Sequence, residues 1–351
     1  MDMLSVINNF IVEGKVVSVV PMGSGHINTT FLVTTDKKKY TLQKINHKVF
    51  TNVDALIDNI DKITRFISNK RCSVELIYTK DYSKYAYDGE SYYRLFNFFE
   101  GYCIDKVEKE EDMYAAGLAY GKFQADLRDF KDDLYDTIPN FHNTLVRYEN
   151  FRKALENASP ERAVIAKYEI EEYLNRYRYA DVVINKIKSG DIPIRVTHND
   201  TKINNIVFNK VTNEPICVID LDTVMKGCLL YDFGDAIRSG GVDTEEDEKD
   251  ISKVSLKENY FGAFAKGFLQ ETKDFITDEE RFLLAFSAIL MTYECGMRFL
   301  TDYLNGDIYF KTKYAEHNLV RARTQLALVM DMERKLLNME KILEDIWKNL
   351  K

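Results

Sequence analysis

The sequence predicts an α+β fold with two lobes: a small antiparallel β N-lobe, residues 1–99, and a large, mainly helical C-lobe, residues 100–351. Two observations support this division. Residues 15–99 contain short β-branched and aromatic runs separated by turn residues, which is the pattern of a sheet. Beyond residue 104, apolar residues recur every three or four positions in long segments, as in amphipathic helices. In this second part, only residues 195–222 are typical of a loop and a hairpin.

In the first lobe we expect three strands, a helix and then two further strands. Residues 36–38 supply a hairpin turn between the second and third strands, and Asp88–Gly89 supplies a turn between the last two. The helix places Leu56, Ile60 and Ile63 on one face. The predicted strands are 16–20, 29–35, 39–45, 74–79 and 92–98, and the predicted helix is 52–69.

In the second lobe we expect long helices, one of which opens with a capping box that runs from Thr277 to Glu280. The predicted helices are 109–130, 161–189, 254–271, 278–304 and 313–348. The apolar residues of the last helix fit core packing better than a dimer seam. The chain is therefore expected to be a monomer or a homodimer.

A short polar motif in the second lobe carries the predicted chemistry. It reads His198-x-Asp200-x-Lys202-x-x-Asn205, and the apolar strand that follows ends in Asp220. Transfer of the γ-phosphoryl group of ATP to a hydroxyl needs a carboxylate that accepts the hydroxyl proton, and oxygen ligands for Mg²⁺. Asp200 and Asn205 have the spacing of a kinase catalytic loop, and Lys202 could reach a γ-phosphate oxygen. The competing interpretation is a polar loop between two core strands.

A glycine-containing turn between the first two strands is a candidate phosphate-binding loop. Gly23, Ser24 and Gly25 would let the backbone fold closely over phosphates with its amide groups pointing inward. Asn28 stands where a third glycine would complete the pattern, and the absence of a G-x-x-x-x-G-K-[ST] motif disfavours a P-loop enzyme. Phe98, in the segment that connects the two lobes, is a further candidate nucleotide contact.

Composition and charge disfavour several function classes. The chain has 351 residues, is 45% hydrophobic and 30% charged, and carries a formal net charge of −8, which argues against nucleic acid as a partner. Its 5 cysteines are scattered without a C-x-x-C pair, as in a reducing compartment. No basic signal region opens the sequence, and the longest apolar stretch, residues 282–293, is too short to span a bilayer. We therefore expect a cytoplasmic protein without a membrane partner.

Together, these motifs resemble the phosphotransferase enzyme family of aminoglycoside and choline kinases, and within it the N-acetylhexosamine 1-kinase branch. The resemblance runs from residue 15 to residue 330. The segments that carry it are 23–28, 40–46, 197–205, 218–224, 231–238 and 296–304. It implies a two-lobed protein-kinase-like fold and phosphorylation of the anomeric C1 hydroxyl of N-acetylglucosamine or N-acetylgalactosamine. It also implies ATP and Mg²⁺ as cofactors.

The resemblance further implies roles for individual residues. Asp200 would be the base that accepts the C1 hydroxyl proton, and Asn205 and Asp220 would hold Mg²⁺. The residues that would contact the sugar are His26, Arg298 and Tyr309.

One departure from the family concerns the cation that pairs with the nucleotide phosphates. The broader family carries a lysine on the third strand, whereas Gln43 and Lys44 are adjacent in this chain. Strand side chains alternate between faces, so only one of the two can point toward the nucleotide. Both are candidate nucleotide-binding residues, and Lys44 is preferred because it carries a charge.

Four further positions have competing interpretations. A literal Asp-Phe-Gly begins at Asp232, inside an expected helix start. For Asp232 and Asp235, helix capping or pairing with Arg238 is favoured over a metal role. Asp222 is a candidate for a second metal ligand. For Arg298, an ion pair with Glu294, four residues earlier, competes with the sugar contact.

The sequence leaves three functions open: a sugar 1-kinase, a kinase of another small molecule, and a non-catalytic nucleotide-binding module. The second class includes kinases of aminoglycosides, choline or other amino alcohols. A cationic substrate would need carboxylates in the second lobe, where the resemblance instead implies Arg298 and Tyr309. A non-catalytic module is disfavoured because Asp200, Asn205 and Asp220 are all present. The sugar 1-kinase is therefore the favoured hypothesis.

Overall fold

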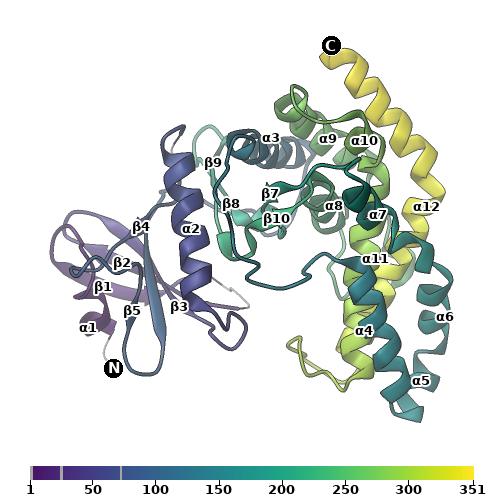
Figure 1. Ribbon diagram of the computed structural model, residues 1–351, viewed down its shortest axis with the longest axis horizontal. Coiled ribbons are helices and arrows are strands. Elements are labelled where there is room, and N and C mark those ends of the chain that lie inside the picture. The colour runs from purple at the N-terminus through teal and green to yellow at the C-terminus, as the bar shows by residue number, and fades with distance from the viewer. Residues whose placement is uncertain (1–2, 24–26, 72) are drawn as a thin grey trace. The chain divides into compact units, whose positions relative to one another are not determined.

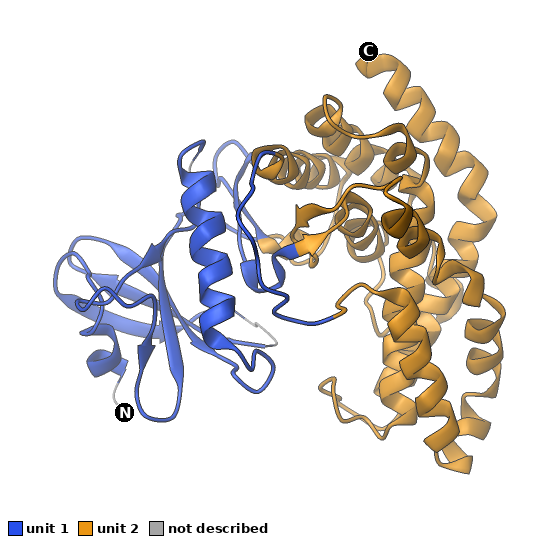
Figure 2. Ribbon diagram, in the orientation of Figure 1, with its two compact units in different colours: residues 1–103, 129–139, 206–225 blue, residues 104–128, 140–205, 226–351 orange. Residues whose placement is uncertain are grey.

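The structure (Figure 1) is a computed structural model of the chain and describes residues 3–23, 27–71 and 73–351. The chain divides into two compact units, which Figure 2 shows in blue and orange. Unit 1 comprises residues 1–103, 129–139 and 206–225, and unit 2 comprises residues 104–128, 140–205 and 226–351. Each unit has a hydrophobic core of its own.

Unit 1 is built on one antiparallel sheet with the strand order β1-β2-β3-β6-β4, and β5 pairs with β6. The strands are β1 (Val16–Pro21), β2 (Thr29–Thr35), β3 (Lys39–Ile45), β4 (Leu76–Ile77), β5 (Ala86–Tyr87) and β6 (Tyr92–Asn97). β2 and β3 have the predicted bounds, whereas the strand expected over 74–79 is much shorter. The turn at Asp88–Gly89 joins β5, rather than β4, to β6. The side chain of Asp88 stabilises this turn by accepting two of its backbone N–H groups.

The two faces of this sheet differ in polarity. One face packs against α1 (Met3–Ile7) in an apolar cluster, which we call the α1 cluster. Its members are Val6, Ile7, Phe10, Val33, Tyr40, Leu42, Ala86, Tyr93 and Leu95. Gln43 of β3 lies directly opposite Arg94 of β6, one position away from cluster residues on both strands. Because strand side chains alternate, Gln43 and Arg94 share the other, polar face.

A helix and a hairpin complete unit 1. Helix α2 (Val53–Ser68) begins after Asn52, whose side chain accepts the backbone N–H of Ala55, and buries its apolar stripe. The hairpin of β8 (Ile206–Phe208) and β9 (Pro215–Val218) is present as predicted. Tyr102 forms a β-bridge with Phe208, so the hairpin is attached to the segment that follows the sheet.

Unit 2 is organised around α11 (Leu284–Leu304), which is buried along most of its length. The ring of Phe233 meets those of Phe261, Phe264 and Phe268 edge to face, with centroids 5.4–5.9 Å apart. The other helices are α3 (Glu110–Leu127), α4 (Thr144–Asn157), α5 (Pro160–Ile165), α6 (Lys167–Asn175), α7 (Val182–Ser189), α8 (Leu229–Gly240), α9 (Glu258–Thr272), α10 (Asp278–Phe282) and α12 (His317–Leu350). Within the described part of the chain, none of the helices combines the length and the apolar character that crossing a membrane requires.

Two predicted helices are divided in the structure, and α4 lies outside the predicted set. The helix expected over 161–189 becomes α5, α6, a 3₁₀ turn and α7, because the backbone leaves helical geometry at Ala166 and Arg176. Arg176 pairs there with Glu333 of the distant helix α12, a contact that local sequence does not reveal. The helix expected over 278–304 breaks at Leu283, between α10 and α11.

Glycines allow α3 and α9 to approach each other backbone to backbone. A Cβ atom at Gly117 of α3 would lie 2.2 Å from the carbonyl oxygen of Phe264. A Cβ atom at Gly267 of α9 would lie 2.3 Å from the carbonyl oxygen of Tyr114. Both distances are far below van der Waals contact, so this close packing requires glycine on both helices.

We expect Gly117→Ala to lower the free energy of unfolding by about 1–3 kcal/mol, because the added methyl group forces the two helices apart. Gly262→Ala, on α9, is the matched control. There the nearest atom to a new Cβ is Ile342 Cγ2 at 3.3 Å, and alanine is the better helix former. Urea denaturation followed by circular dichroism measures both variants, and equal stability of the two would contradict the close packing.

Candidate active site

The loop that carries the predicted catalytic residues, loop 198–205, follows β7 (Arg195–Thr197) in unit 2. β7 pairs with β10 (Met225–Gly227), which fixes the start of the loop. Most of the loop is buried, but the side chains of Asp200 and Lys202 keep 28% and 41% of their surface exposed. Asn199 adopts a left-handed backbone conformation (φ 64°), which asparagine tolerates better than most residues. Two charged side chains thus reach solvent from a fixed loop.

Two carboxylates of helix α8 hold this loop in place. Asp232 accepts the backbone N–H groups of His198 (2.9 Å) and Asn199 (2.7 Å). Asp235 accepts the backbone N–H of Thr201 (2.9 Å). Burial raises the pKa of the Asp232 carboxyl group, against the opposing effect of the nearby His198. The backbone of the loop therefore depends on the position of α8.

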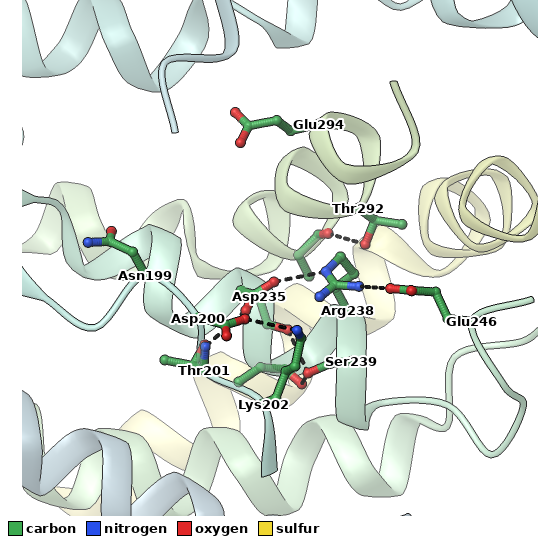
Figure 3. Close-up of polar contacts among 12 residues, drawn as sticks. Asn199, Asp200, Thr201, Lys202, Asp235, Arg238, Ser239, Glu246, Thr292 and Glu294 are labelled. Atoms are coloured by element: carbon green, nitrogen blue, oxygen red, sulfur yellow. Dashed lines mark hydrogen bonds and ion pairs between the residues drawn. The ribbon is translucent and has the colours of Figure 1, made fainter. Parts of the chain in front are cut away.

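Asp232, the first residue of the Asp-Phe-Gly sequence in α8, has a structural role in these contacts. Asp232 Oδ2 also accepts a hydrogen bond from Gln124 Nε2 (2.6 Å), so both of its oxygens are engaged inside the protein. The predicted pairing with Arg238 is confirmed for Asp235, at 2.8 Å, and Arg238 also bonds to Glu246 (Figure 3). Asp232 anchors the loop instead of pairing with an arginine.

Asp200, Lys202 and Asn205 converge within the loop. Lys202 Nζ lies 3.2 Å from Asp200 Oδ1 (Figure 3). Asn205 Nδ2 donates to the backbone carbonyl of Asp200 at 2.9 Å and to its carboxylate at 3.3 Å. Burial alone would raise the pKa of Asp200, but Lys202 and His198 outweigh it and hold that pKa below its ordinary value. The Asp200 carboxyl group is consequently ionised at neutral pH.

A buried chain of contacts, which sequence reasoning missed, connects this loop to helix α11. Glu294 Oε1 lies 2.8 Å from His142 Nδ1, and His142 Nε2 lies 2.9 Å from the carbonyl oxygen of Asn199. Thr144 donates to the second oxygen of Glu294 at 2.5 Å. Burial would raise the pKa of Glu294, but His142 lowers it below the ordinary value. These partners engage both oxygens of the Glu294 carboxylate. The sequence offered an ion pair with Arg298 as the alternative to a sugar contact, and that ion pair does not account for either oxygen.

The candidate sugar-binding residues Arg298 and Tyr309 also lie in unit 2. The guanidinium of Arg298 lies over the rings of Phe141 and Phe310, 5.3 Å and 5.7 Å from their centroids. Asp302 accepts the backbone N–H groups of residues 308–310 at 2.8–3.0 Å, which fixes the loop that carries Tyr309. Tyr309 itself is 60% exposed. Its side chain is therefore available to a ligand.

A second guanidinium, that of Arg147 on α4, lies near Arg298. Arg147 donates through Nε and Nη2 to the carbonyl oxygen of Phe141, the residue whose ring Arg298 covers. Burial, and then the charge of Arg298, lower the pKa of Arg147 below its ordinary value. Two arginine side chains and the carboxylate of Glu294 therefore interact electrostatically in this part of unit 2. Sequence reasoning missed Arg147 because α4 itself was not predicted.

The predicted metal ligand Asp220 and its neighbour Asp222 belong to unit 1. Asp220 follows β9 with a left-handed backbone (φ 59°), a conformation that costs free energy for a residue with a side chain. Asp222 is buried, and its carboxylate pairs with Arg94 Nη1 at 2.5 Å and accepts a hydrogen bond from Asn28 Nδ2 at 2.6 Å. Both oxygens of Asp222 are therefore engaged within unit 1.

Strand register decides how Gln43 and Lys44 point. Gln43 lies opposite Arg94 and accepts a hydrogen bond from Arg94 Nε at 2.9 Å, on the polar face. Lys44 lies opposite Tyr93, a member of the α1 cluster, and so belongs to the other face. Strand geometry therefore favours Gln43 as the nucleotide contact, whereas the sequence analysis preferred Lys44. Nucleotide contact by either residue remains a prediction.

The remaining candidates belong to the glycine turn and to the segment after β6. Gly23 has a positive φ of 76° with open space where a Cβ would stand. Phe98 lies with its ring centroid 5.7 Å from Lys39 Nζ. Ser24, Gly25 and His26 lie outside the described residues. The roles of these five candidates, four in nucleotide binding and His26 in sugar binding, remain predictions.

Comparison with known proteins supports the predicted fold. Residues 18–283 match the Phosphotransferase enzyme family. The microcompartment-associated aminopropanol kinase is 13% identical, with a TM-score of 0.62 over 96% of this chain and 98% of that one. Choline kinase from Cryptosporidium parvum Iowa II is 14% identical, with a TM-score of 0.60 over 96% of both chains. Spectinomycin phosphotransferase in complex with ADP and spectinomycin is 12% identical, with a TM-score of 0.55 over 91% of this chain and 92% of that one. The predicted two-lobed, protein-kinase-like α+β fold is confirmed.

We expect Asp232→Asn to lower the free energy of unfolding by about 1–3 kcal/mol, because an NH₂ group would replace one acceptor oxygen and leave one buried backbone N–H group of the loop unpaired. Turnover should fall with it, since the backbone beside Asp200 is no longer fixed. The control is Asp274→Asn, the same change at an exposed position. Chemical denaturation and steady-state kinetics are measured on both. Unchanged stability of Asp232→Asn would show that α8 does not anchor the loop.

Proposed function

The chain belongs to the Phosphotransferase enzyme family, and from this premise we propose that it is an ATP- and Mg²⁺-dependent kinase of the C1 hydroxyl of an N-acetylhexosamine. The observation that carries the proposal is the pairing of Asp200 with Lys202, at 3.2 Å, in a loop whose backbone α8 fixes. Phosphoryl transfer needs from the protein a positioned proton acceptor and charges that stabilise the transferred group, with little covalent chemistry.

Asp200 acts as the base of the proposed reaction. The C1 oxygen of the sugar forms a bond to the γ-phosphorus of ATP, while the bond from that phosphorus to the β–γ bridging oxygen breaks and ADP leaves. Asp200 takes the proton of the C1 hydroxyl. Lys202, whose ammonium group is partly exposed beside Asp200, neutralises charge on the phosphoryl oxygens. Because the pKa of Asp200 is lowered, the base stays ionised through the neutral range.

Asn205 and Asp220 would hold Mg²⁺, which neutralises charge on the nucleotide phosphates when it is bound. Magnesium prefers oxygen ligands and usually takes one or two carboxylates together with phosphate oxygens and water. The residues fit this demand: the Asn205 amide nitrogen donates to Asp200, which leaves its amide oxygen for a cation. The described residues include no cluster of three or more His, Cys, Asp or Glu side chains that could hold a metal, so the nucleotide would complete the coordination.

The charges near Arg298 decide between neutral and cationic acceptors. Arg298 and Arg147 lie close enough for one charge to lower the pKa of the other. A choline-like or aminoglycoside ammonium group would add a third positive charge there. The neighbouring Glu294 carboxylate is already engaged by His142 and Thr144. In the acidic run 243–248, Asp243, Glu246 and Asp247 pair with other residues of the protein. A neutral substrate with many oxygen atoms that accept hydrogen bonds, such as an N-acetylhexosamine, fits this environment better.

We expect Asp200→Asn to lower kcat by about 10²–10⁴-fold, the usual contribution of a general base, while nucleotide affinity changes little. Asp274→Asn is again the isosteric surface control. Turnover is followed by ADP release, and nucleotide affinity by titration calorimetry. Retention of more than about a tenth of wild-type kcat would be incompatible with the base role.

We expect Arg298→Ala to raise the KM for the sugar at least about tenfold and to leave the KM for ATP within twofold, because a buried polar group of the ligand loses its partner. Arg152→Ala, which removes a half-exposed arginine from α4, is the control. The same assay is run over N-acetylglucosamine, N-acetylgalactosamine, glucosamine, choline, 1-amino-2-propanol and kanamycin. Phosphorylation of the amines alone would refute the sugar-kinase proposal and leave the family assignment intact.

A further inference from the structure

The guanidinium of Arg94 is a buried charge on the polar face of the unit 1 sheet. Arg94 is 1% exposed and lies on β6, the strand paired with β3, β4 and β5. Its Nε donates to Gln43 Oε1 at 2.9 Å, its Nη1 lies 2.5 Å from Asp222 Oδ1, and it lies over the ring of Phe96. Burying a charge costs several kcal/mol unless it is paired, so these contacts are needed to hold Arg94 where it is.

The partner carboxylate, Asp222, connects Arg94 to the segment that precedes β2. Asn28 Nδ2 donates to Asp222 Oδ2 at 2.6 Å, and Asn28 Oδ1 accepts the backbone N–H of Asn46 at 3.0 Å. Gln43 in turn donates to Thr30 Oγ1 at 3.2 Å. The polar face thus carries one connected network that joins Arg94 of β6 to Gln43 of β3, to Thr30 of β2 and to the segment that precedes β2.

A buried ion pair is weak evidence of a contribution to stability, because the desolvation of both charges opposes their attraction. A kinase, however, needs a cation on this sheet for the nucleotide phosphates. Gln43 is neutral and Lys44 lies on the face of the α1 cluster. Lys39 stands at the first residue of β3, is exposed, and pairs with Glu100. Among the described residues, Arg94 is the cation at the middle of the polar face.

We propose that Arg94 is the phosphate-binding cation of the nucleotide site, in place of a lysine on the third strand, and that Asp222 is its partner when no nucleotide is bound. This rests on the proposed function. Arginine has five N–H groups in a planar fork, more than its contacts with Gln43 and Asp222 use. Gln43 holds the guanidinium in orientation, so the fork can meet phosphate oxygens without first being ordered.

The test is the affinity of the full chain for Mg²⁺–ATP and for adenosine, measured by titration calorimetry. Arg94→Met should raise the Kd for ATP at least about tenfold and leave the Kd for adenosine within twofold, because adenosine has no phosphate for the fork to bind. Arg65→Met removes an exposed arginine of unit 1 and should change neither value. Arg94→Met with Gln43→Lys returns a cation from the facing strand position and should recover part of the ATP affinity.

Arg94→Lys is a second variant, to be used if Arg94→Met does not fold. Lysine keeps a positive charge to pair with Asp222 and loses only the planar arrangement of N–H groups. It should raise the Kd for ATP severalfold and leave that for adenosine unchanged. ATP affinity within twofold of wild type in every folded Arg94 variant would overturn the inference, as would a parallel loss for ATP and adenosine. If the wild-type chain binds no ATP, the proposed function itself is refuted. If the wild type binds ATP and Lys44→Ala abolishes that binding, only the role of Arg94 is refuted.

Discussion

The buried carboxylate of Asp232 accepts two consecutive backbone N–H groups from loop 198–205, and the candidate site in unit 2 is arranged around this contact. Helix α8 can hold the loop only if it is itself fixed. Gly234 provides this, since a Cβ there would lie 2.3 Å from the carbonyl oxygen of Ser287 on α11. The same helix α11 carries Glu294, which reaches the loop through His142. Helix α11 therefore supports the loop in two ways, through its packing against α8 and through the contacts of Glu294 and His142.

The buried carboxylates of Asp235 and Asp222, one in each unit, share a feature: each is held by two directed partners. In unit 2, Asp235 is held by Arg238 and a loop N–H group. In unit 1, Asp222 is held by Arg94 and Asn28. The low dielectric of the interior makes such contacts strong when complete and makes a missing partner costly. A carboxylate whose two oxygens are both engaged in this way is a poor candidate for binding a metal ion.

The sequence was sufficient to predict those elements whose structure depends on neighbouring residues alone. β2 and β3 have the predicted bounds because β-branched residues and a short polar turn define them without help from the rest of the chain. The spacing of Asp200, Lys202 and Asn205 was likewise readable, because a catalytic loop is a short contiguous segment. The break of the helix expected over 161–189 was not readable, because it accompanies the pairing of Arg176 with α12. Contacts that join distant segments, such as those of His142 and Arg94, leave no periodic signal.

The loop that carries Tyr309 is ordered by the protein itself. Asp302 accepts three of its backbone N–H groups, Asn318 donates to Asp302 and Asp307, and Arg162 pairs with Asp307. Its conformational entropy is lost during folding, so a ligand does not have to order it. Association with different ligands should then proceed at similar rates, since no rearrangement of this loop precedes contact. Discrimination among acceptors would be expressed in how long each one stays bound.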